Sequence, residues 1–380
     1  MNKRGNAVVW VIIFVLVIIG VWYFAGRTPA TNTTTSTGPI TIGFTGPLSG
    51  DLANVGENAK AAVEVAVSEV NAAGGINGRP LNVIYEDDKC AGPEAVSAAQ
   101  KLINIDKVPV ILGSTCSPAT LAIAPIAEQA KVVALSYCST APKISDSGDY
   151  IFRDVPSDLF QAKYAAQYAY NTLKKTKVAI VYINNDWGIG LNKAFSDAFT
   201  ALGGTVVSSE AYAPDSKDLR SQITKVKAST ADLFYFPSFT DGAISGIKQA
   251  RVLGLKQPIL AADSWDDNKI WDTLGADGNG AMYTRVKTNS SDAFKASMKA
   301  KLGNDSIVYC SNFAYDGIKI LAQVMSQVGT DSTKIKDALY NVNYTGGVSN
   351  QTIKFDQNGD PVGADYNVLV VKNAKAEVLQ

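Results

Sequence analysis

The sequence predicts an α/β protein with two successive sheets, each mostly parallel and flanked by helices, behind an N-terminal transmembrane helix. Apolar segments of strand length alternate with amphipathic segments of helix length over most of the 380 residues. Such alternation is typical of right-handed β-α-β units and therefore of a parallel sheet. The alternation starts again after Arg153, and the chain is long enough for two domains of ordinary size.

The first series of elements lies before Arg153. An amphipathic helix is expected from Gly56 to the Gly74-Gly75 pair, because small and apolar residues recur there every three or four positions. The other elements expected in this series are strands at residues 39–45, 81–85, 108–112 and 131–135, and helices at residues 93–105 and from Pro118 onward.

The second series begins at residue 160 and repeats the alternation. Two antiparallel strands at residues 351–355 and 366–371 are expected to close the chain as a hairpin around the turn sequence Asp356-Gln-Asn-Gly359. The other expected elements are helices at residues 160–173, 191–202, 219–226, 244–253, 293–302 and 314–328, and strands at residues 178–183, 205–209, 231–236 and 258–262.

Residues 1–26 are expected to form a signal anchor, a transmembrane helix that is not cleaved. Lys3 and Arg4 precede an uncharged, apolar run from Ala7 to Ala25, and about 20 such residues can cross a bilayer. The run lacks a lipid-attachment cysteine, and a cleaved signal peptide is the alternative. The basic end predicts that the rest of the chain lies outside, at the cell surface, anchored in the cytoplasmic membrane. Residues 27–38 are rich in threonine and are expected to be a linker.

The composition argues against an enzyme and against several classes of partner. The chain has no histidine, which removes the commonest general base and most transition-metal sites. Its 35 basic and 35 acidic residues give no net charge that would favour nucleic acid. The four cysteines include no Cys-x-x-Cys pair, which would favour a zinc or redox centre. We therefore expect no metal and no cofactor, and an enzyme that uses Asp263 is retained only as an alternative.

The candidate binding residues follow the predicted strands, at the edge where open α/β sheets bind ligands. They offer hydroxyl groups, two aromatic faces and one carboxylate, a set suited to a zwitterion with an apolar side chain. These candidates are residues 113–117, 138–140, 184–187 and 237–239, and Asp263.

The stretch from Val110 to Ala119 shows the chemistry most clearly. A strand there runs into a helix that Pro118 opens, and the free N–H groups of a helix N-terminus favour an anion. Hydroxyl donors precede the helix, and a small carboxylate is the expected ligand. The same stretch also fits an ordinary loop capped by Ser117.

Four motifs occur in a fixed order along the chain. They are Gly43-Phe-Thr-Gly-Pro-Leu-Ser-Gly50, Asn71-Ala-Ala-Gly-Gly-Ile-Asn-Gly-Arg-Pro-Leu81 followed by Tyr85-Glu-Asp-Asp-Lys-Cys90, Arg251-Val-Leu-Gly-Leu255, and Phe355-Asp-Gln-Asn-Gly-Asp360. In this order they resemble the leucine/isoleucine/valine-binding proteins of bacterial and archaeal ABC importers. The resemblance covers roughly residues 39 to 372.

This resemblance implies a type I periplasmic-binding fold, in which two α/β lobes joined by three chain crossings close on a small ligand. The crossings are expected near residues 153–157, 282–286 and 344–349. The N-terminal lobe would contain residues 39–155 and 286–345, and the C-terminal lobe residues 156–285 and 346–380.

The resemblance also implies ligand-binding residues on the N-terminal lobe. Ser117 matches the family's serine that holds the ligand carboxylate. Cys138 and Thr140, with Ser139 between them, match the positions that hold the ammonium and the carboxylate. Val55 falls where the family often has an aromatic wall.

Three further residues are implied on the C-terminal lobe. Trp187 and Phe239 stand where the family usually has tyrosines. Asp263 matches the usual glutamate that pairs with the ligand ammonium, although an aspartate there also fits a helix N-cap. Because these residues differ from the usual ones, the preference among apolar side chains is left open.

The resemblance pairs Cys90 with Cys116 in a disulfide. Cys138 and Cys310 then form a second disulfide beside the ligand or stay as two buried thiols.

The expected function is a membrane-anchored, monomeric solute-binding protein. It would capture amino acids, branched-chain or otherwise hydrophobic, by closing its cleft, and deliver them to an ABC permease. One alternative is a sensory ectodomain, against which stands a cytoplasmic part of about six residues. Another is a protein that binds a related small amide or carboxylate.

Overall fold

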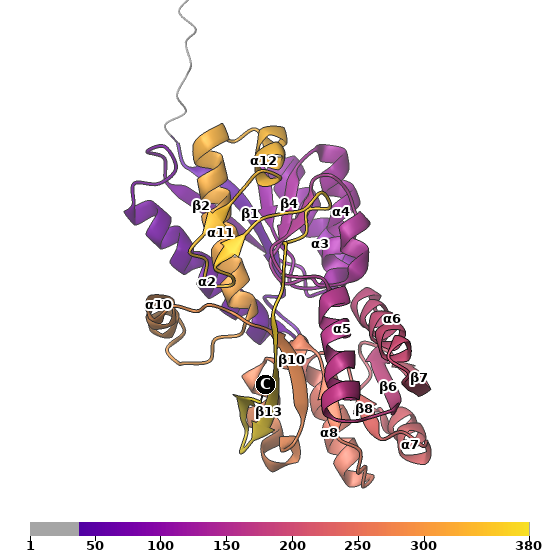
Figure 1. Ribbon diagram of the computed structural model, residues 1–380. Coiled ribbons are helices and arrows are strands. Elements are labelled where there is room, and N and C mark those ends of the chain that lie inside the picture. The colour runs from indigo at the N-terminus through magenta and orange to yellow at the C-terminus, as the bar shows by residue number, and fades with distance from the viewer. Residues whose placement is uncertain (1–37, 380) are drawn as a thin grey trace, which may run out of the picture. The chain divides into compact units, whose positions relative to one another are not determined.

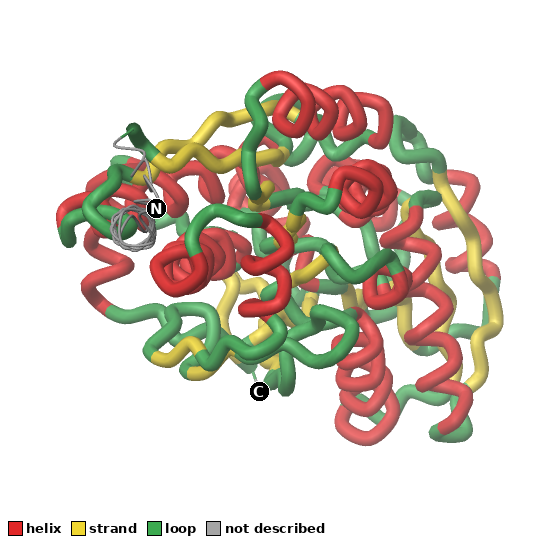
Figure 2. The backbone as a smooth tube through the Cα atoms, turned by 90° about the horizontal axis from the view of Figure 1, so that it is seen from above, coloured by secondary structure: helices red, strands yellow, loops and turns green. Residues whose placement is uncertain are grey.

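The computed structural model describes residues 38–379, and residues 39–380 form one compact unit. The expected anchor over residues 1–26 and the expected linker, apart from Gly38, lie outside the described residues. Among the residues described, no helix combines the length and hydrophobicity that a bilayer crossing requires. The unit contains two large sheets and one two-stranded sheet, and the strands run between the helices (Figure 1, Figure 2).

The first sheet has five parallel strands in the order β2-β1-β3-β4-β5. Its central strands β3 and β4 are short and fully buried, as is usual for a parallel sheet covered on both faces. The four predicted strands are confirmed, whereas the three-residue β5 was not predicted. The strands are β1 (Ile40–Gly46), β2 (Leu81–Asp87), β3 (Val110–Leu112), β4 (Val133–Ser136) and β5 (Ile151–Arg153).

Helices cover both faces of the first sheet. In Figure 1, α2 and α11 lie together on one side and α3 and α4 on the other. The start of α2 is fixed by a close approach, since a Cβ on Gly56 would lie 2.0 Å from the carbonyl oxygen of Pro47. These helices are α2 (Ala53–Ala72), α3 (Gly92–Gln100), extended by η1 (Lys101–Ile105), α4 (Ser117–Ala130), α10 (Asp292–Leu302), α11 (Cys310–Val328) and α12 (Ser332–Leu339), with the short turn η2 (Pro142–Asp146).

The second sheet has seven strands in the order β14-β13-β10-β9-β8-β6-β7. The strands from β6 to β10 are parallel, and β13 is antiparallel to both of its neighbours. β6, β7, β8 and β9 are confirmed predictions, and β13 confirms the strand predicted at residues 366–371. The strands are β6 (Lys177–Ile183), β7 (Thr205–Tyr212), β8 (Leu233–Tyr235), β9 (Ile259–Ala261), β10 (Met282–Val286), β13 (Tyr366–Lys372) and β14 (Lys375–Val378).

The helices of the second sheet include two that begin at candidate binding residues. Asn185 caps α6 by accepting a hydrogen bond from the backbone N–H of Gly188, and α8 begins directly after Phe239. The helices are α5 (Asp158–Gln167), extended by η3 (Tyr168–Thr172), α6 (Asp186–Ala201), α7 (Arg220–Ala228), α8 (Thr240–Val252) and α9 (Asn268–Leu274), with the short turns η4 (Asp263–Trp265) and η5 (Gly275–Gly278).

The closing hairpin predicted between residues 351–355 and 366–371 is wrong. β13 pairs instead with β10 and β14, because its nearly continuous apolar sequence suits an interior strand. Upstream, β12 (Thr352–Ile353) pairs with β11 (Tyr344–Thr345). The turn sequence closes only a single bridge between Phe355 and Pro361.

Each large sheet has its own hydrophobic core, and the chain passes between them three times. β5 leads into α5, β10 is followed by α10, and the last passage leads into β13. Before that passage Phe355 is buried in the first core and Asp360 contacts Arg153. Phe239 and Tyr164 pack against both cores, so they lie where the two parts meet.

Candidate functional site

Each large sheet with its helices and core forms one part of the molecule. A pocket lies between these two parts, where strands of both sheets end. Its cavity volume is about 40 Å³, and it is partly open to solvent. Six of the seven predicted ligand residues line it: Ser117, Cys138, Thr140, Trp187, Phe239 and Asp263. The seventh, Ser139, does not line it, since its buried side chain donates to the carbonyl oxygen of Ser114 and contacts the Thr120 hydroxyl.

One end of the pocket is formed by the start of α4. Ser117 is the first residue of this helix and is 2% exposed, and Pro118 follows it at a position where its missing N–H costs nothing. The Ser117 hydroxyl oxygen accepts a hydrogen bond from the backbone N–H of Ala141 at 3.1 Å, so the hydroxyl proton can be donated to another acceptor. A hydroxyl donor beside a helix N-terminus favours an anion at this end.

The Thr140 hydroxyl joins the two parts across the pocket. It donates to the Asp158 carboxylate at 2.9 Å and accepts from the indole N–H of Trp187 at 3.1 Å. The backbone N–H of Asp158 in turn donates to the carbonyl oxygen of Thr140 at 2.8 Å. The hydroxyl proton of Thr140 therefore points to Asp158 in this arrangement, and a carboxylate at Thr140 would need that contact to rearrange.

Two aromatic rings form a wall of the pocket. The rings of Trp187 and Phe239 are stacked, with centroids 5.0 Å apart and planes inclined by 19°. The start of α6 holds Trp187 in place, because a Cβ on Gly188 would lie 2.0 Å from the carbonyl oxygen of Ile183. Val55 and Leu52 line the pocket as further apolar side chains. This wall suits an apolar group.

The other end of the pocket carries a carboxylate. Asp263 is 3% exposed, and its burial raises the pKa of the carboxyl to about 6. The Tyr309 hydroxyl donates to Asp263 at 2.5 Å. The N-cap residue of η4 is Ala262, and Asp263 is the first residue of the turn, so Asp263 does not have the N-cap position that the sequence also allowed. A buried carboxylate in this position favours a cationic group.

Sequence reasoning missed three polar residues of the pocket, Ser264, Asp266 and Tyr309. Asp266 accepts hydrogen bonds from the Arg285 guanidinium at 2.7 Å and from the backbone N–H of Tyr309 at 3.1 Å. The Arg285 guanidinium compensates the charge of Asp266, whereas Asp263 accepts from the Tyr309 hydroxyl and lies near two other carboxylates, Asp266 and Asp158. The available signal for Tyr309 was its position directly before Cys310, since a bridge to Cys138 brings both to the pocket.

All four cysteines of the chain are in disulfides. Cys90 pairs with Cys116, with Cα atoms 5.2 Å apart, and Cys138 pairs with Cys310, with Cα atoms 5.5 Å apart. The first bridge ties the end of β2 to the residue before α4, and the second ties the Cys138 loop to α11. Both therefore restrain segments that line the pocket.

Comparisons with known proteins agree with this arrangement. The family model described as periplasmic binding protein matches residues 39–376. An amino acid binding protein of Pseudomonas aeruginosa is 31% identical over 247 residues, which are 65% of this chain and 65% of that protein's length. A leucine-binding protein of Thermotoga maritima has 25% identity and a TM-score of 0.83, over 90% of this chain and 98% of that one.

A third similar protein was solved with a ligand bound. The substrate-binding protein of a branched-chain amino acid transporter from Streptococcus pneumoniae, solved in complex with isoleucine, has 27% identity and a TM-score of 0.81. The alignment covers 90% of this chain and 99% of that one. The predicted type I periplasmic-binding fold is confirmed. This chain is thus a solute-binding protein and not an enzyme, and it belongs to the periplasmic binding protein family.

Proposed function

We propose that this chain captures a hydrophobic amino acid as its zwitterion and delivers it to an ABC permease. The observation that carries the proposal is the polarity of the pocket: a hydroxyl at a helix start at one end, a buried carboxylate at the other, and aromatic and aliphatic side chains around them. The isoleucine complex and the leucine-binding relative support the same ligand class.

The α-carboxylate would be held at the start of α4. Ser117 would donate its hydroxyl to it, with Thr140 and the backbone at Cys138 and Ser139 nearby. Charge-assisted hydrogen bonds of this kind contribute about 1.5–3 kcal/mol each.

The ammonium group would pair with Asp263. To reach it, the ligand would replace or share the hydrogen bond from Tyr309. The side chain would then lie against Trp187, Phe239 and Val55. The disulfide between Cys138 and Cys310 would fix the floor of the pocket.

Closure would bring the two halves of this site together. The N-terminal lobe would contain residues 39–155 and 287–361, and the C-terminal lobe residues 156–286 and 362–380. We propose the third crossing after Asp360, later than residues 344–349; the support is that Phe355 is buried in the first core and that Asp360 pairs with Arg153. A ligand that contacts both lobes binds the closed form better and shifts the population toward it.

The location is part of the proposal. Residues 1–26 would anchor the chain in the cytoplasmic membrane, with the binding domain outside as a monomer beside its permease. The support is the basic, then apolar, N-terminal sequence.

Calorimetric titration of residues 39–380 with the twenty common amino acids tests the ligand class. Leucine, isoleucine or valine, or another apolar amino acid, is expected to bind with micromolar or tighter affinity, and aspartate and lysine are expected to give no heat. Binding of amides, sugars or aromatic acids with no binding of any amino acid would contradict the proposal.

A further inference from the structure

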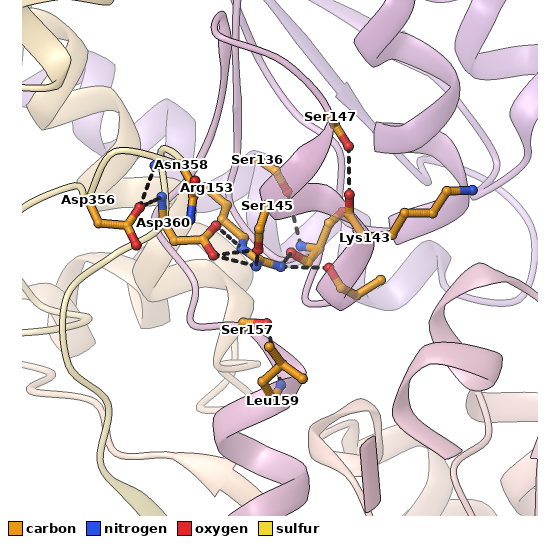
Figure 3. Close-up of polar contacts among 12 residues, drawn as sticks. Ser136, Lys143, Ser145, Ser147, Arg153, Ser157, Leu159, Asp356, Asn358 and Asp360 are labelled. Carbon is orange, nitrogen blue, oxygen red and sulfur yellow. Dashed lines mark hydrogen bonds and ion pairs between the residues drawn. The ribbon is translucent and has the colours of Figure 1, made fainter. Parts of the chain in front are cut away.

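Arg153, the last residue of β5, is fully buried and has all of its donor groups engaged. Figure 3 shows its side chain pointing toward Asp360 and Ser145. Its Nε donates to one carboxylate oxygen of Asp360 at 2.6 Å, and its Nη2 donates to the other at 2.8 Å. This two-point ion pair joins the end of β5 to the segment that precedes β13.

The remaining donors of Arg153 reach the loop that carries Thr140. Nη1 donates to the carbonyl oxygen of Ala141 at 2.9 Å and, more weakly, to that of Ser139 at 3.5 Å. Nη2 also donates to the Ser145 hydroxyl at 2.7 Å, and that hydroxyl donates to Asp360 at 2.7 Å. One guanidinium therefore holds the backbone on both sides of Thr140.

This arrangement orients the loop toward the pocket. In a trans peptide the C=O and the following N–H point in opposite directions. When Arg153 draws the carbonyl of Ser139 toward itself, the N–H of Thr140 faces away from Arg153. The neighbouring Ala141 N–H meets the Ser117 hydroxyl at 3.1 Å, and Thr140 lines the pocket.

Arg153 belongs to one of the three segments in which the chain passes between the two cores, and it contacts another. Arg153 itself begins the passage into α5, and its backbone N–H donates to the carbonyl oxygen of Gly359 at 3.0 Å. Asp158, at the start of α5, contacts Thr140 through both its backbone and its carboxylate. The loop at Thr140, the first passage and the last passage are thus connected through Arg153.

We infer that Arg153 is a positioning residue for ligand binding, which sets the Ser139–Ala141 backbone for the ligand carboxylate and links it to the passages that bend on closure. A buried ion pair is weak support for stability as such, because desolvation offsets the attraction. The planar arginine fork can serve a carboxylate, a hydroxyl and carbonyl oxygens at once, which lysine cannot. This inference rests on the proposed function, since it assigns the carboxylate to this loop.

The test compares Arg153→Lys with wild type and with Arg251→Lys in residues 39–380, a compact unit with its own cores. Arg251 is a matched control, because it also donates to two loop carbonyl oxygens, those of Asp277 and Asn279, but on the second sheet. Arg153→Lys is expected to weaken binding of the amino acid found by calorimetry by about tenfold or more. Arg251→Lys is expected to stay within about twofold of wild type.

Amide hydrogen exchange provides a readout that needs no ligand. Arg153→Lys is expected to speed exchange in residues 139–145 and leave β6 and β8 unchanged, while circular dichroism matches wild type. Unchanged exchange in that loop, or affinity within twofold of wild type, would overturn the inference. If wild type binds no amino acid, the proposed function fails and the exchange result alone decides the positioning role.

A second variant covers the case in which Arg153→Lys does not fold. Ser145→Ala removes one contact of the guanidinium and keeps the ion pair with Asp360. It is expected to weaken binding by about two- to fivefold and to speed exchange in the same loop. Wild-type affinity and exchange in folded Ser145→Ala would also overturn the inference.

Discussion

At the scale of single residues, Asp263 has the position that the resemblance implied and surroundings that the sequence did not reveal. Its burial raises the pKa of its carboxyl to about 6, and Tyr309 is its hydrogen-bond donor. Asp158 lies close enough to add repulsion, because each buried carboxylate disfavours ionisation of the other. A ligand ammonium would favour the ionised form of Asp263, so binding and ionisation are linked.

This linkage predicts a pH dependence of binding. Below about pH 6 Asp263 is protonated before binding and must release its proton to the solvent when the ammonium arrives. Affinity should therefore be constant above about pH 6.5 and fall about tenfold per pH unit below about pH 6. Titrations between pH 5 and 8, in buffers that differ in ionisation enthalpy, measure the affinity and the released proton.

Protonation of Asp51 is expected to have the opposite effect on affinity at low pH, so a variant of Asp51 supplies the control. The pKa of Asp51 is raised to about 6, first by burial and then by repulsion from Asp241, although the backbone N–H of Asp241, from the second part of the molecule, donates to it at 2.8 Å and favours the ionised form. Because burial and repulsion outweigh this hydrogen bond where the two parts meet, closure is expected to favour a protonated Asp51, and Asp51→Asn should make the loss of affinity at low pH steeper. Affinity that does not change between pH 5 and 8 in Asp51→Asn would contradict the role of Asp263.

Asp154 predicts an effect on stability and not on binding. It is 2% exposed, and no residue among those described donates a hydrogen bond to either carboxylate oxygen. Burial, and then repulsion from Asp316, raises its pKa well above the usual value. A raised pKa in the folded state means that its stabilising contribution is complete below the unfolded pKa of about 3.9 and is lost as pH rises. Asp154→Asn, which stays neutral, should thus stabilise the protein at pH 7 by about 1–3 kcal/mol.

The gain should shrink toward zero at pH 4, where wild-type Asp154 also becomes neutral in the unfolded chain. Urea unfolding at pH 4, 5.5 and 7 measures it, with Asp305→Asn as the control at an exposed carboxylate that pairs with Lys299. A destabilised Asp154→Asn at pH 7 would show that the carboxylate has a partner that these contacts do not include.

At the scale of elements, the sequence predicted what local patterns determine. The strands with continuous apolar runs and the helices with three- and four-residue spacing are confirmed, and η1 and η3 account for the predicted length of two helices. β5 was not predicted, because its three residues end in the charged Arg153 and so lack the continuous apolar run of the equally short β3, β8 and β9. β13 was paired with the wrong segment, because strand pairing depends on neighbours distant in the sequence.

The candidate site divides in the same way. The ends of strands are visible in the sequence, and six of the seven predicted residues do line one pocket. The side chain of Ser139 points into the protein and away from the pocket that Thr140 lines. Nothing in the composition of this loop distinguishes the two residues. Tyr309 and Asp266 reach the pocket from segments whose placement depends on a disulfide and on Arg285.

At the scale of the whole molecule, the pocket lies where the two parts meet, and the proposed function has these parts close around a ligand. Hydrogen bonds from Trp187 to Thr140 and from Tyr309 to Asp263 cross between them. The two ends of the pocket thus come from different parts of the molecule, and under the proposed closure a ligand has to satisfy both ends to favour the closed form. The central claim is that the ligand is recognised at both charged ends.

Calorimetry with leucine and with two analogues that each lack one charged group tests this claim most directly. 4-Methylpentanoate keeps the carboxylate for Ser117 and lacks the ammonium, and 3-methylbutylamine keeps the ammonium for Asp263 and lacks the carboxylate. If leucine is the ligand found in the amino acid panel, both analogues should bind at least about 100-fold more weakly, because each leaves a buried group of the protein unpaired. An analogue that binds as tightly as leucine would contradict recognition of the zwitterion.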